Sequence, residues 1–499
     1  MKVYNSEINR NKNNLKFSKK GLILVNVLVF AVIASVVTTS LVNWATTIIR
    51  NTRELSTREQ ALQAAEAGID YYRWHLAHAP SDYKDGVATT TTGPFIHDFK
   101  DKDGNIIGQF ALTITPPPVG STLVKIKSKG TVSGNTVSRT IQTTLAIPSF
   151  AKFAVVANDI MRFGAGTEVF GPIHSNNGIR FDGLAHNIIT SAKDKYIDTD
   201  NGTHNPAWYE FGVYTTINPT ELNQDTTPPS TVPSRPDVFM AGRQFPIAAV
   251  DFTGITVDLS QMKADAQASG KYFGASGSQG YRIVLKINDT FDLYKVTSLK
   301  STPSGCTNSS NQTGWGIWSI NNQTFLQNYP LPTNGLIFVE DHIWVEGQIN
   351  TARVTIAAGK FPDNASTRKD IIVNNDLLYT NYDGQDTIAL VAQGNISAGL
   401  YSENDLRIDA ALMAQNGRVG RFYYNNDCES SNSGNEYLRN SITLYGMIGT
   451  NLRYGFAYTD GTGYNIRNII YDSNLLYAPP PSFPLTSDQY SILSWEEIK

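Results

Sequence analysis

One uncharged stretch near the N-terminus constrains this 499-residue chain more than any other feature. From Gly21 to Ile49, 29 consecutive residues include no charged side chain. A helix needs about 20 apolar residues to cross a bilayer, so the stretch predicts a single transmembrane helix. Six basic residues and one acid precede it, which predicts a cytoplasmic N-terminus and an external position for everything after Ile49. A cleaved secretory signal is the alternative, but such signals have a shorter apolar core.

The junction in front of this stretch has a recognisable pattern. Ser18-Lys19-Lys20-Gly21 is followed directly by Leu22. This resembles the leader of type IV prepilins, which is cut after a glycine that stands between basic residues and an apolar helix. The resemblance implies that a prepilin peptidase cuts between Gly21 and Leu22 and methylates the new N-terminus. Residues 1–21 would then be a cytoplasmic basic leader.

The fifth residue of the mature chain would be Asn26, where this family usually has glutamate. In the family, that carboxylate pairs with the terminal amine of a neighbouring subunit. An amide cannot neutralise an amine, and an unpaired carboxylate is costly in lipid. Asn26 therefore suits a tip subunit or a rare subunit of a filament. The alternative is that Asn26 is a tolerated polar residue in a simple anchor.

The apolar helix is predicted to continue outside the membrane as a stalk, so that one helix covers residues 22–79. No proline interrupts the pattern before Pro80. Apolar residues recur at helical spacings of three, four or seven, namely Leu55, Leu62, Ala65, Ile69 and Leu76.

Within the stalk, residues 63–70 read QAAEAGID and resemble the alanine-rich stretch of PilX-type minor pilins. Small side chains let another backbone approach closely. We therefore expect Ala64, Ala65, Ala67 and Gly68 to pack against the helix of another subunit. The alternative is an alanine-rich surface helix, in which Gly68 would cost about 1 kcal/mol.

Residues 80–148 are predicted to form a separate β domain, because residues 94–148 alternate between apolar and polar side chains, which is typical of half-buried strands. Strands are predicted over 106–114, 123–128 and 137–147. Asp103-Gly104 and Gly134-Asn135 are hairpin turn signals. We expect a small antiparallel sheet packed beside the helix, as in a pilin head.

After Pro148 the pattern changes to short apolar strands joined by glycine and asparagine. Between Gly335 and Gly446 such strands recur about every ten residues, with no helical pattern between them. Parallel strands without intervening helices indicate a solenoid, because each turn stacks on the last. We expect a right-handed parallel β-helix over 149–480, with a β-sandwich as the alternative.

Several segments interrupt the predicted solenoid. Residues 190–245 contain a proline-rich run and resemble an excursion from the core, while 258–269 is predicted to be a short helix. Residues 300–330 and 424–437 are polar loops. The C-terminal tail, 481–499, resembles that of large PilX-type proteins and is expected to lie along the solenoid and cover one of its faces.

Composition excludes other classes of protein. Only 17% of the residues are charged, against about 25% in an ordinary globular protein, and the net charge is −3. The absence of a basic excess argues against nucleic-acid binding. Two cysteines, Cys306 and Cys428, lie in separate polar loops. Outside the membrane they could form a disulfide, although the sequence favours neither a bridge nor free thiols.

The sequence offers weak signals for metal binding. Asp198-Thr-Asp200-Asn-Gly202 begins like a calcium loop, but Glu210 lies one position from where the closing acid is required. A plain turn stabilised by an aspartate side chain is the favoured interpretation. His75 and His78 lie one helical turn apart at a helix end. There they are expected to interact favourably with the helix dipole and not to act as metal ligands. We expect neither a metal nor a cofactor.

A β-helix can also hold a polysaccharide lyase or hydrolase, which requires clustered carboxylates. The two acidic groups in the solenoid, Asp405 with Asp409 and Glu340 with Asp341 and Glu346, are indistinguishable from solvated strand edges. Three tryptophans could stack on sugars or fill corners, namely Trp315, Trp318 and Trp344. We therefore expect no catalytic activity.

The leading hypothesis is a non-catalytic minor pilin-like subunit of a type IV pilus or pseudopilus, mainly β in its external region. Its expected partners are the membrane, a prepilin peptidase, other pilin subunits, and a surface or polysaccharide ligand. A membrane-anchored, carbohydrate-active β-helix is the alternative from another class. A purely structural surface anchor is the third.

Overall fold

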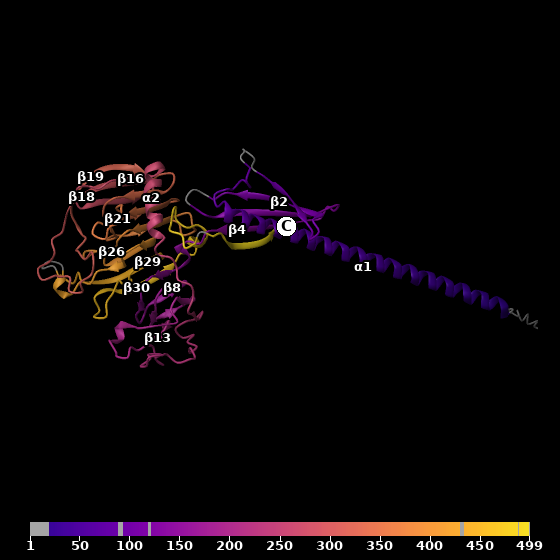
Figure 1. Ribbon diagram of the computed structural model, residues 1–499, viewed down its shortest axis with the longest axis horizontal. Helices are drawn as coiled ribbons and strands as arrows, with labels where there is room; N and C mark the ends of the chain where they lie inside the picture. Colours follow the sequence, from indigo (N-terminus) through magenta and orange to yellow (C-terminus); the bar gives the residue numbers. More distant parts are fainter. Residues whose placement is uncertain (1–18, 88–92, 118–120, 430–433, 488, 499) are drawn as a thin grey trace, which may run out of the picture.

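Helix α1 (Lys19–His78) is 60 residues long and projects away from the rest of the molecule (Figure 1). The computed structural model describes residues 19–87, 93–117, 121–429, 434–487 and 489–498. Most of the predicted leader, residues 1–18, lies outside these ranges. At 1.5 Å per residue α1 is about 90 Å long. Among the described helices, α1 alone is long and apolar enough to cross a membrane.

The C-terminal half of α1 packs on a small antiparallel sheet, as predicted. The core of this unit joins Ile69, Tyr72 and Leu76 of the helix to apolar residues that point inward from the strands. The sheet has five strands in the order β1-β2-β3-β4-β31, namely β1 (Phe95–Lys100), β2 (Ile106–Thr115), β3 (Val124–Val132), β4 (Ser138–Ala146) and β31 (Ser491–Ile498).

Beyond β4, short parallel strands stack in three rows around an apolar core, so the predicted β-helix is confirmed and the β-sandwich is wrong. The first row runs without a break through β16 (Lys271–Phe273), β20 (Leu336–Val339), β22 (Arg353–Ala358), β25 (Thr387–Ala392), the ends of β27 (Asp405–Ala414) and β29 (Leu438–Thr450), β5 (Val155–Ala157), β8 (Ile173–Ser175), β11 (Ile189–Ser191) and β15 (Arg243–Gln244).

The other two rows complete each turn of the solenoid. One contains β17 (Gly280–Lys286), β21 (Ile343–Gln348), β23 (Ile371–Ile372), β26 (Ile396–Ala398) and β28 (Val419–Arg421). The other contains β24 (Leu377–Leu378), the first halves of β27 and β29, β30 (Gly463–Tyr471), β7 (Glu168–Phe170) and β10 (Leu184–Ala185).

The remaining elements include a further parallel sheet, which contributes Met161, Ile179 and Val213 to the solenoid core, and several additions outside that core. A three-stranded parallel sheet contains β6 (Met161–Phe163), β9 (Ile179–Phe181) and β14 (Val213–Tyr214). Two antiparallel additions are the pair β12 (Lys195–Tyr196) and β13 (Glu210–Phe211), and the strands β18 (Thr290–Leu299) and β19 (Ile320–Pro330), which extend β17. The short helices are η1 (Phe150–Lys152), η2 (Thr199–Asn201), η3 (Asn426–Cys428) and α3 (Asn474–Tyr477).

The order of the turns differs from the expected one. The chain enters the middle of the stack at β5, runs to one end at β15, and returns to the other end through helix α2 (Ile255–Ser269). It then runs back to the middle, where β29 pairs with β5 through Ile448 and Val155. Most turns stack on the turn that precedes them in the sequence, but the turn that contains β29 stacks on the turn that contains β5. Strand spacing reports that a solenoid forms but not where the chain enters it.

The junction between the two halves of the solenoid is as continuous as the rest of the stack. One inward column of aliphatic side chains passes straight through it, namely Ile337, Ile356, Leu390, Leu412, Ile448, Val155, Ile173 and Ile189. At a corner, Asn158 Nδ2 donates to Asn451 Oδ1 at 2.9 Å, and Asn176 Nδ2 donates to Asn158 Oδ1 at 2.8 Å.

Helix α2 confirms the short helix predicted at 258–269 and begins three residues earlier. Its residues Leu259, Met262 and Ala266 cover the outer side of the first row. The strands there are buried on both sides, which explains their continuous apolar sequences. The prediction that 190–245 lies outside the core was wrong for part of that segment, because Val213 and Phe239 are in the solenoid core.

The C-terminal tail does more than was expected. Phe483 packs beside α2 on the solenoid, and Thr355 donates a hydrogen bond to the carbonyl of Pro481. The chain then crosses back to the antiparallel sheet as β31. At the crossing, Thr486 N donates to the Pro148 carbonyl at 2.8 Å, so the outgoing and returning segments contact each other. The expectation that the tail lies along the solenoid was therefore wrong for β31, which pairs with β4.

Candidate functional site

The two halves of α1 have opposite environments. The apolar side chains between Ile23 and Ile49 are exposed, and Phe30 keeps 71% of its surface accessible. Asn26 lies within this exposed half. Gly21 and Leu22 lie in the first turn of the helix, two and three residues after its start at Lys19. Burying so much apolar surface is favourable at about 25 cal/mol per Å², so this half requires lipid or other helices around it.

The small residues of the stalk pack against the chain itself. Ala64, Ala65 and Gly68 are buried under the antiparallel sheet, and Ala67 is partly buried there. A Cβ on Gly68 would lie 2.3 Å from Ser128 Oγ of β3. The prediction that this patch packs on the helix of another subunit was therefore wrong for these residues. The sequence indicated a close approach, but the partner is strand β3.

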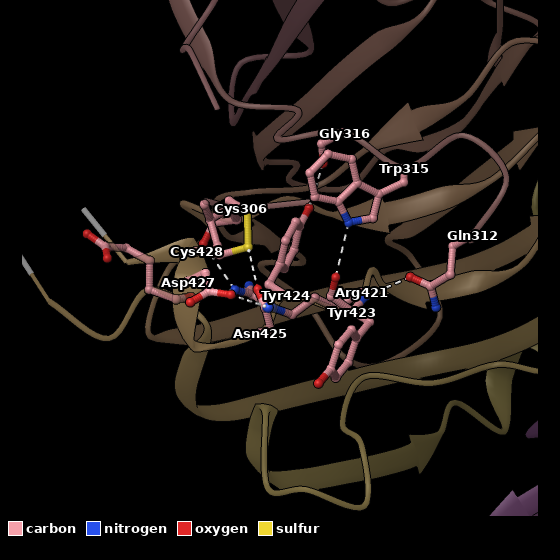
Figure 2. Close-up of a disulfide and its surroundings, with 12 residues drawn as sticks. Cys306, Gln312, Trp315, Gly316, Arg421, Tyr423, Tyr424, Asn425, Asp427 and Cys428 are labelled. Carbon is pink, nitrogen blue, oxygen red and sulfur yellow. Dashed lines mark hydrogen bonds between the residues drawn. A yellow bond between two sulfur atoms is a disulfide. The ribbon is translucent and has the colours of Figure 1, made fainter. Parts of the chain in front are cut away.

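A disulfide joins two loops at one corner of the solenoid (Figure 2). Cys306 and Cys428 are bonded, with their Cα atoms 4.4 Å apart. Around the bridge, Trp315 Nε1 donates to the Tyr423 carbonyl at 3.0 Å, and Tyr424 Oη donates to the Gly316 carbonyl at 2.7 Å. Residues 300–319 and the segment after β28 therefore form one packed unit, although both are polar loops in the sequence.

Arg421 lies at the centre of this corner and is fully buried. Its guanidinium donates to the carbonyls of Gly399, Leu400 and Glu436, and it lies 5.0 Å from the centre of the Tyr424 ring. Burial lowers the pKa of Arg421. Such a cation is tolerated because carbonyl oxygens take the place of water. Its contacts are all within the protein and link the backbone segments at Gly399, Leu400 and Glu436.

A cleft of about 300 Å³ lies where the added strands β18 and β19 leave the solenoid. Its walls combine charged, amide and aromatic side chains from both parts. The lining residues are Arg282, Lys300, Ser319, Ile320, Asn321, Gln323, Trp344, Val345, Glu346, Asn374, Asn375 and Tyr401. The sequence signal for it was weak, because these residues are distributed over more than a hundred positions.

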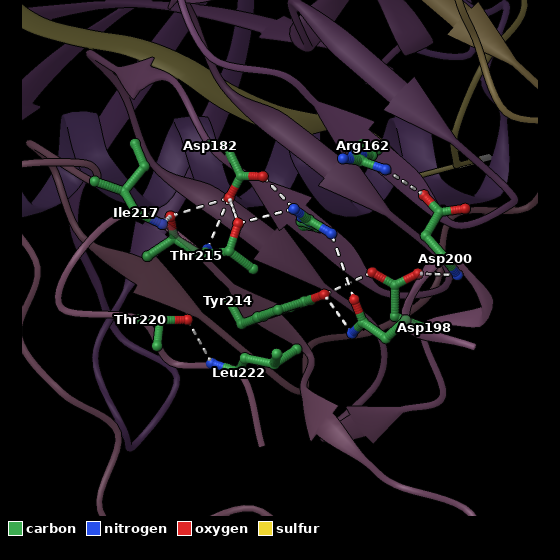
Figure 3. A network of polar contacts seen from close by, with 12 residues as sticks. Arg162, Asp182, Asp198, Asp200, Tyr214, Thr215, Ile217, Thr220 and Leu222 are labelled. Carbon is green, nitrogen blue, oxygen red and sulfur yellow. Dashed lines mark hydrogen bonds and ion pairs between the residues drawn. The ribbon is translucent and has the colours of Figure 1, made fainter. Parts of the chain in front are cut away.

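The acidic turn at Asp198 lies in a separate polar network (Figure 3). Asp198 accepts from Asp200 N at 2.9 Å and from Tyr214 Oη at 2.6 Å. Asp200 forms ion pairs with Arg162 at 3.1 Å and Arg453 at 2.9 Å. Its hydrogen bond to Arg453 is the main reason that the pKa of this carboxyl is lowered. These carboxylates are held by protein groups, as the plain-turn interpretation expects.

Glu210 lies beside this network and is 1% exposed. Its carboxylate accepts from Asn223 N at 2.9 Å and Asn201 Nδ2 at 3.2 Å. Burial, and then the negative charge of Asp198, raise the pKa of Glu210 to about 7. In the described part of the chain, no group of three or more histidine, cysteine, aspartate or glutamate side chains is arranged to hold a metal ion.

The other acidic groups singled out in the sequence also have structural partners. Asp409 accepts from Arg407 at 2.8 Å and Tyr382 at 2.6 Å. Asp341 accepts from Ser276 Oγ at 2.7 Å and Lys369 at 3.1 Å. Further acceptors of this kind are Glu340 with Tyr272, Glu346 with Arg282, and Asp405 with Ser441.

The three tryptophans have mainly internal contacts. Trp344 is 3% exposed and its Nε1 donates to the Trp318 carbonyl at 2.9 Å. Trp318 donates to the Gly314 carbonyl at 2.9 Å, and Trp315 packs beside the disulfide. Trp344 therefore fills a corner of the solenoid and is too buried to stack on a ligand.

At the end of α1, His75 contacts Asp82 at 3.1 Å and His78 contacts the Trp74 carbonyl at 2.8 Å.

Comparisons with known proteins include a match to a solved structure. No family model matches the chain, and neither does any curated protein. The chain is similar to a solved structure of the competence-associated pilin ComZ from Thermus thermophilus, at 14% identity. The match covers 89% of this chain and 97% of that one, with a TM-score of 0.28. The two structures therefore superpose poorly despite the coverage.

Proposed function

We propose that the chain is a non-catalytic, minor pilin-like subunit of a type IV pilus or pseudopilus. After removal of the leader by a prepilin peptidase, the exposed half of α1 would pack among the helices of other subunits. The β-helix would be carried on the outside as a module for adhesion or assembly. The subunit would pass through the cytoplasmic membrane before assembly, with its N-terminus in the cytoplasm.

The observation that supports this proposal best is the division of α1 at the end of its apolar stretch. One continuous helix presents bare apolar side chains up to Ile49 and then packs on a small antiparallel sheet from Ala61 onward. A simple lipid anchor requires only the first half. A stiff stalk fixed to a head domain gives each subunit a defined position in a helical array. The Gly21-Leu22 junction stands directly in front of it.

Asn26 supports a position at or near the tip. At the fifth mature position, an amide forms hydrogen bonds but leaves the amine of a neighbouring subunit charged. A subunit with no neighbour above it has no amine to neutralise. The proposed role requires no catalysis, which agrees with the structural partners of Asp409 and Asp341 described above.

The proposal is tested with the variant Gly21→Ala in a host that assembles type IV pili. We expect the wild-type chain to be shortened and to be present in the filament fraction sheared from cells, because cleavage precedes assembly. Gly21→Ala should remain at full length and stay with the membrane. The matched control is Gly164→Ala, where a methyl group meets open space. Equal incorporation of Gly21→Ala and the control would contradict the proposal.

A further inference from the structure

We propose that the cleft between the β18–β19 strands and the solenoid binds an uncharged saccharide. This inference rests on the proposed function in one respect, namely that the β-helix is displayed outside the cell. The cleft volume of about 300 Å³ is at the lower end for small-molecule sites, so it suits a short saccharide segment.

Of the three charged side chains in the cleft lining, Arg282 and Glu346 neutralise each other, which leaves the single positive charge of Lys300. Glu346 accepts hydrogen bonds from both Arg282 and Asn375. Lys300 lies over the ring of Tyr401, 4.5 Å from its centre. The remaining polar lining is dominated by neutral amides. A phosphate or a strongly acidic ligand would be expected to meet several converging cations, and an apolar ligand would offer no hydrogen bond to an amide such as that of Gln323.

The amides and Tyr401 match the two kinds of surface that a sugar presents. Asparagine and glutamine side chains both donate and accept hydrogen bonds, as sugar hydroxyls do. The ammonium over Tyr401 marks an accessible, electron-rich ring face. Sugar C–H groups carry partial positive charge and can take the same place, because the exposed lysine side chain is flexible. Trp344 is 3% exposed and supports the floor of the cleft.

The walls are held in position before any ligand arrives. Asn374 donates to the Trp318 carbonyl at 2.7 Å and accepts from Gly399 N at 2.7 Å. Residues 301–318, between Lys300 and Ser319, contain Cys306, whose bridge to Cys428 ties this loop to the solenoid. A fixed cleft loses little conformational entropy on binding, which favours affinity for a small ligand.

The test uses full-length protein in detergent on an array of immobilised neutral oligosaccharides of glucose, galactose, mannose and N-acetylglucosamine. The same array presents uronic acid and sulfated oligosaccharides and duplex DNA. We expect binding to one neutral class. Gln323→Ala should weaken it about threefold to tenfold, the loss of one hydrogen bond. Tyr401→Ala should weaken it further, while Tyr401→Phe should retain most of it.

Gln327→Ala is the matched control, since Gln327 is an exposed glutamine of the same strand outside the cleft lining. Thermal unfolding shows whether Tyr401→Ala is folded, and Gln323→Ala, on the exposed strand, keeps the test decisive if it is not. Binding only to acidic saccharides or DNA, no binding at all, or equal affinity of Gln323→Ala and Gln327→Ala would overturn the proposal.

Failure of this proposal can be told from failure of the proposed function. Gln323→Ala should still be shortened at the N-terminus and incorporated into filaments. Gly21→Ala protein in detergent should still bind the array. Loss of one property without the other assigns the failure to the cleft or to the helix.

Discussion

Gly130 in β3 allows α1 to approach the sheet more closely than any residue with a side chain would. A Cβ at this position would lie 2.0 Å from the Ala61 carbonyl oxygen and 2.5 Å from Ala65 N. Both atoms belong to the helix backbone, which cannot give way without moving the stalk. The alanine-rich segment of the helix and this glycine therefore form one contact.

We expect Gly130→Ala to lower the free energy of unfolding of the head by about 1–3 kcal/mol, through overpacking. Urea unfolding of the variant measures this, with Gly164→Ala as the control in open space. Equal midpoints for the two variants would show that the helix and sheet are not in this close contact.

Glu210 predicts a pH dependence with a defined sign. Its pKa rises from 4.5 to about 7 on folding, mainly through burial. Between these values the folded state binds more protons than the unfolded state, so stability falls as pH increases from about 4.5 to about 7. Glu210→Gln should remove up to about 3 kcal/mol of this loss.

Unfolding free energies of wild-type and Glu210→Gln protein at pH 5 and pH 8 test this directly. The control is Glu168→Gln, whose side chain is 56% exposed on the same solenoid. A wild-type difference between the two pH values that Glu210→Gln leaves unchanged would rule out Glu210 as its source.

Small residues in the sequence predicted a close contact on α1 but not its partner. Ala64, Ala65 and Gly68 carry the same local signal whether they meet a foreign helix or a strand of the same chain. The decisive residue, Gly130, is about sixty positions away in a strand whose alternation gave no sign of it. Likewise, spacing placed Glu210 near Asp198 in the chain, but only the fold reveals its burial.

At the level of elements, β31 determines how the head, formed by α1 and the antiparallel sheet, is joined to the solenoid. It pairs with β4, although all the strands of the solenoid lie between these two strands in the sequence. Thr143 Oγ1 donates to the Ser494 carbonyl at 2.7 Å, and Tyr490 adds its ring to the core of the head. The chain therefore leaves the head through Pro148 and returns to it, giving two connections instead of one.

Deleting residues 487–499 should expose the edge of β4 and remove Tyr490 from the head core. We expect faster amide hydrogen exchange in β4, with β25 in the solenoid unchanged as the internal control. Unchanged exchange in β4 would show that β31 does not pair there in solution.

Element types were more predictable than their order. Alternation predicted the antiparallel sheet, and strands of about ten-residue spacing predicted the solenoid. The same patterns could not place β5 beside β29, because an inward-facing aliphatic strand fits any neighbouring turn. Nor could they assign Ser491–Ile498 to the head, since the interactions that fix this strand join residues about 350 positions apart.

For the whole molecule, the structure combines an exposed apolar rod, a head fixed to the end of that rod, and a β-helix joined to the head by two chain segments. The unprotected apolar half of α1 cannot remain in water. Lipid before assembly and other helices afterwards would satisfy it in turn. The proposed function therefore requires removal of the basic leader, since a charged segment at the end of α1 would obstruct packing in a filament.

The most direct test of this account is mass spectrometry of the mature N-terminus of the wild-type protein, isolated from its own membrane or filaments. The account predicts a chain that begins at Leu22 with a methylated amine. A chain that begins at Met1 and retains Lys19, Lys20 and Gly21 would contradict it.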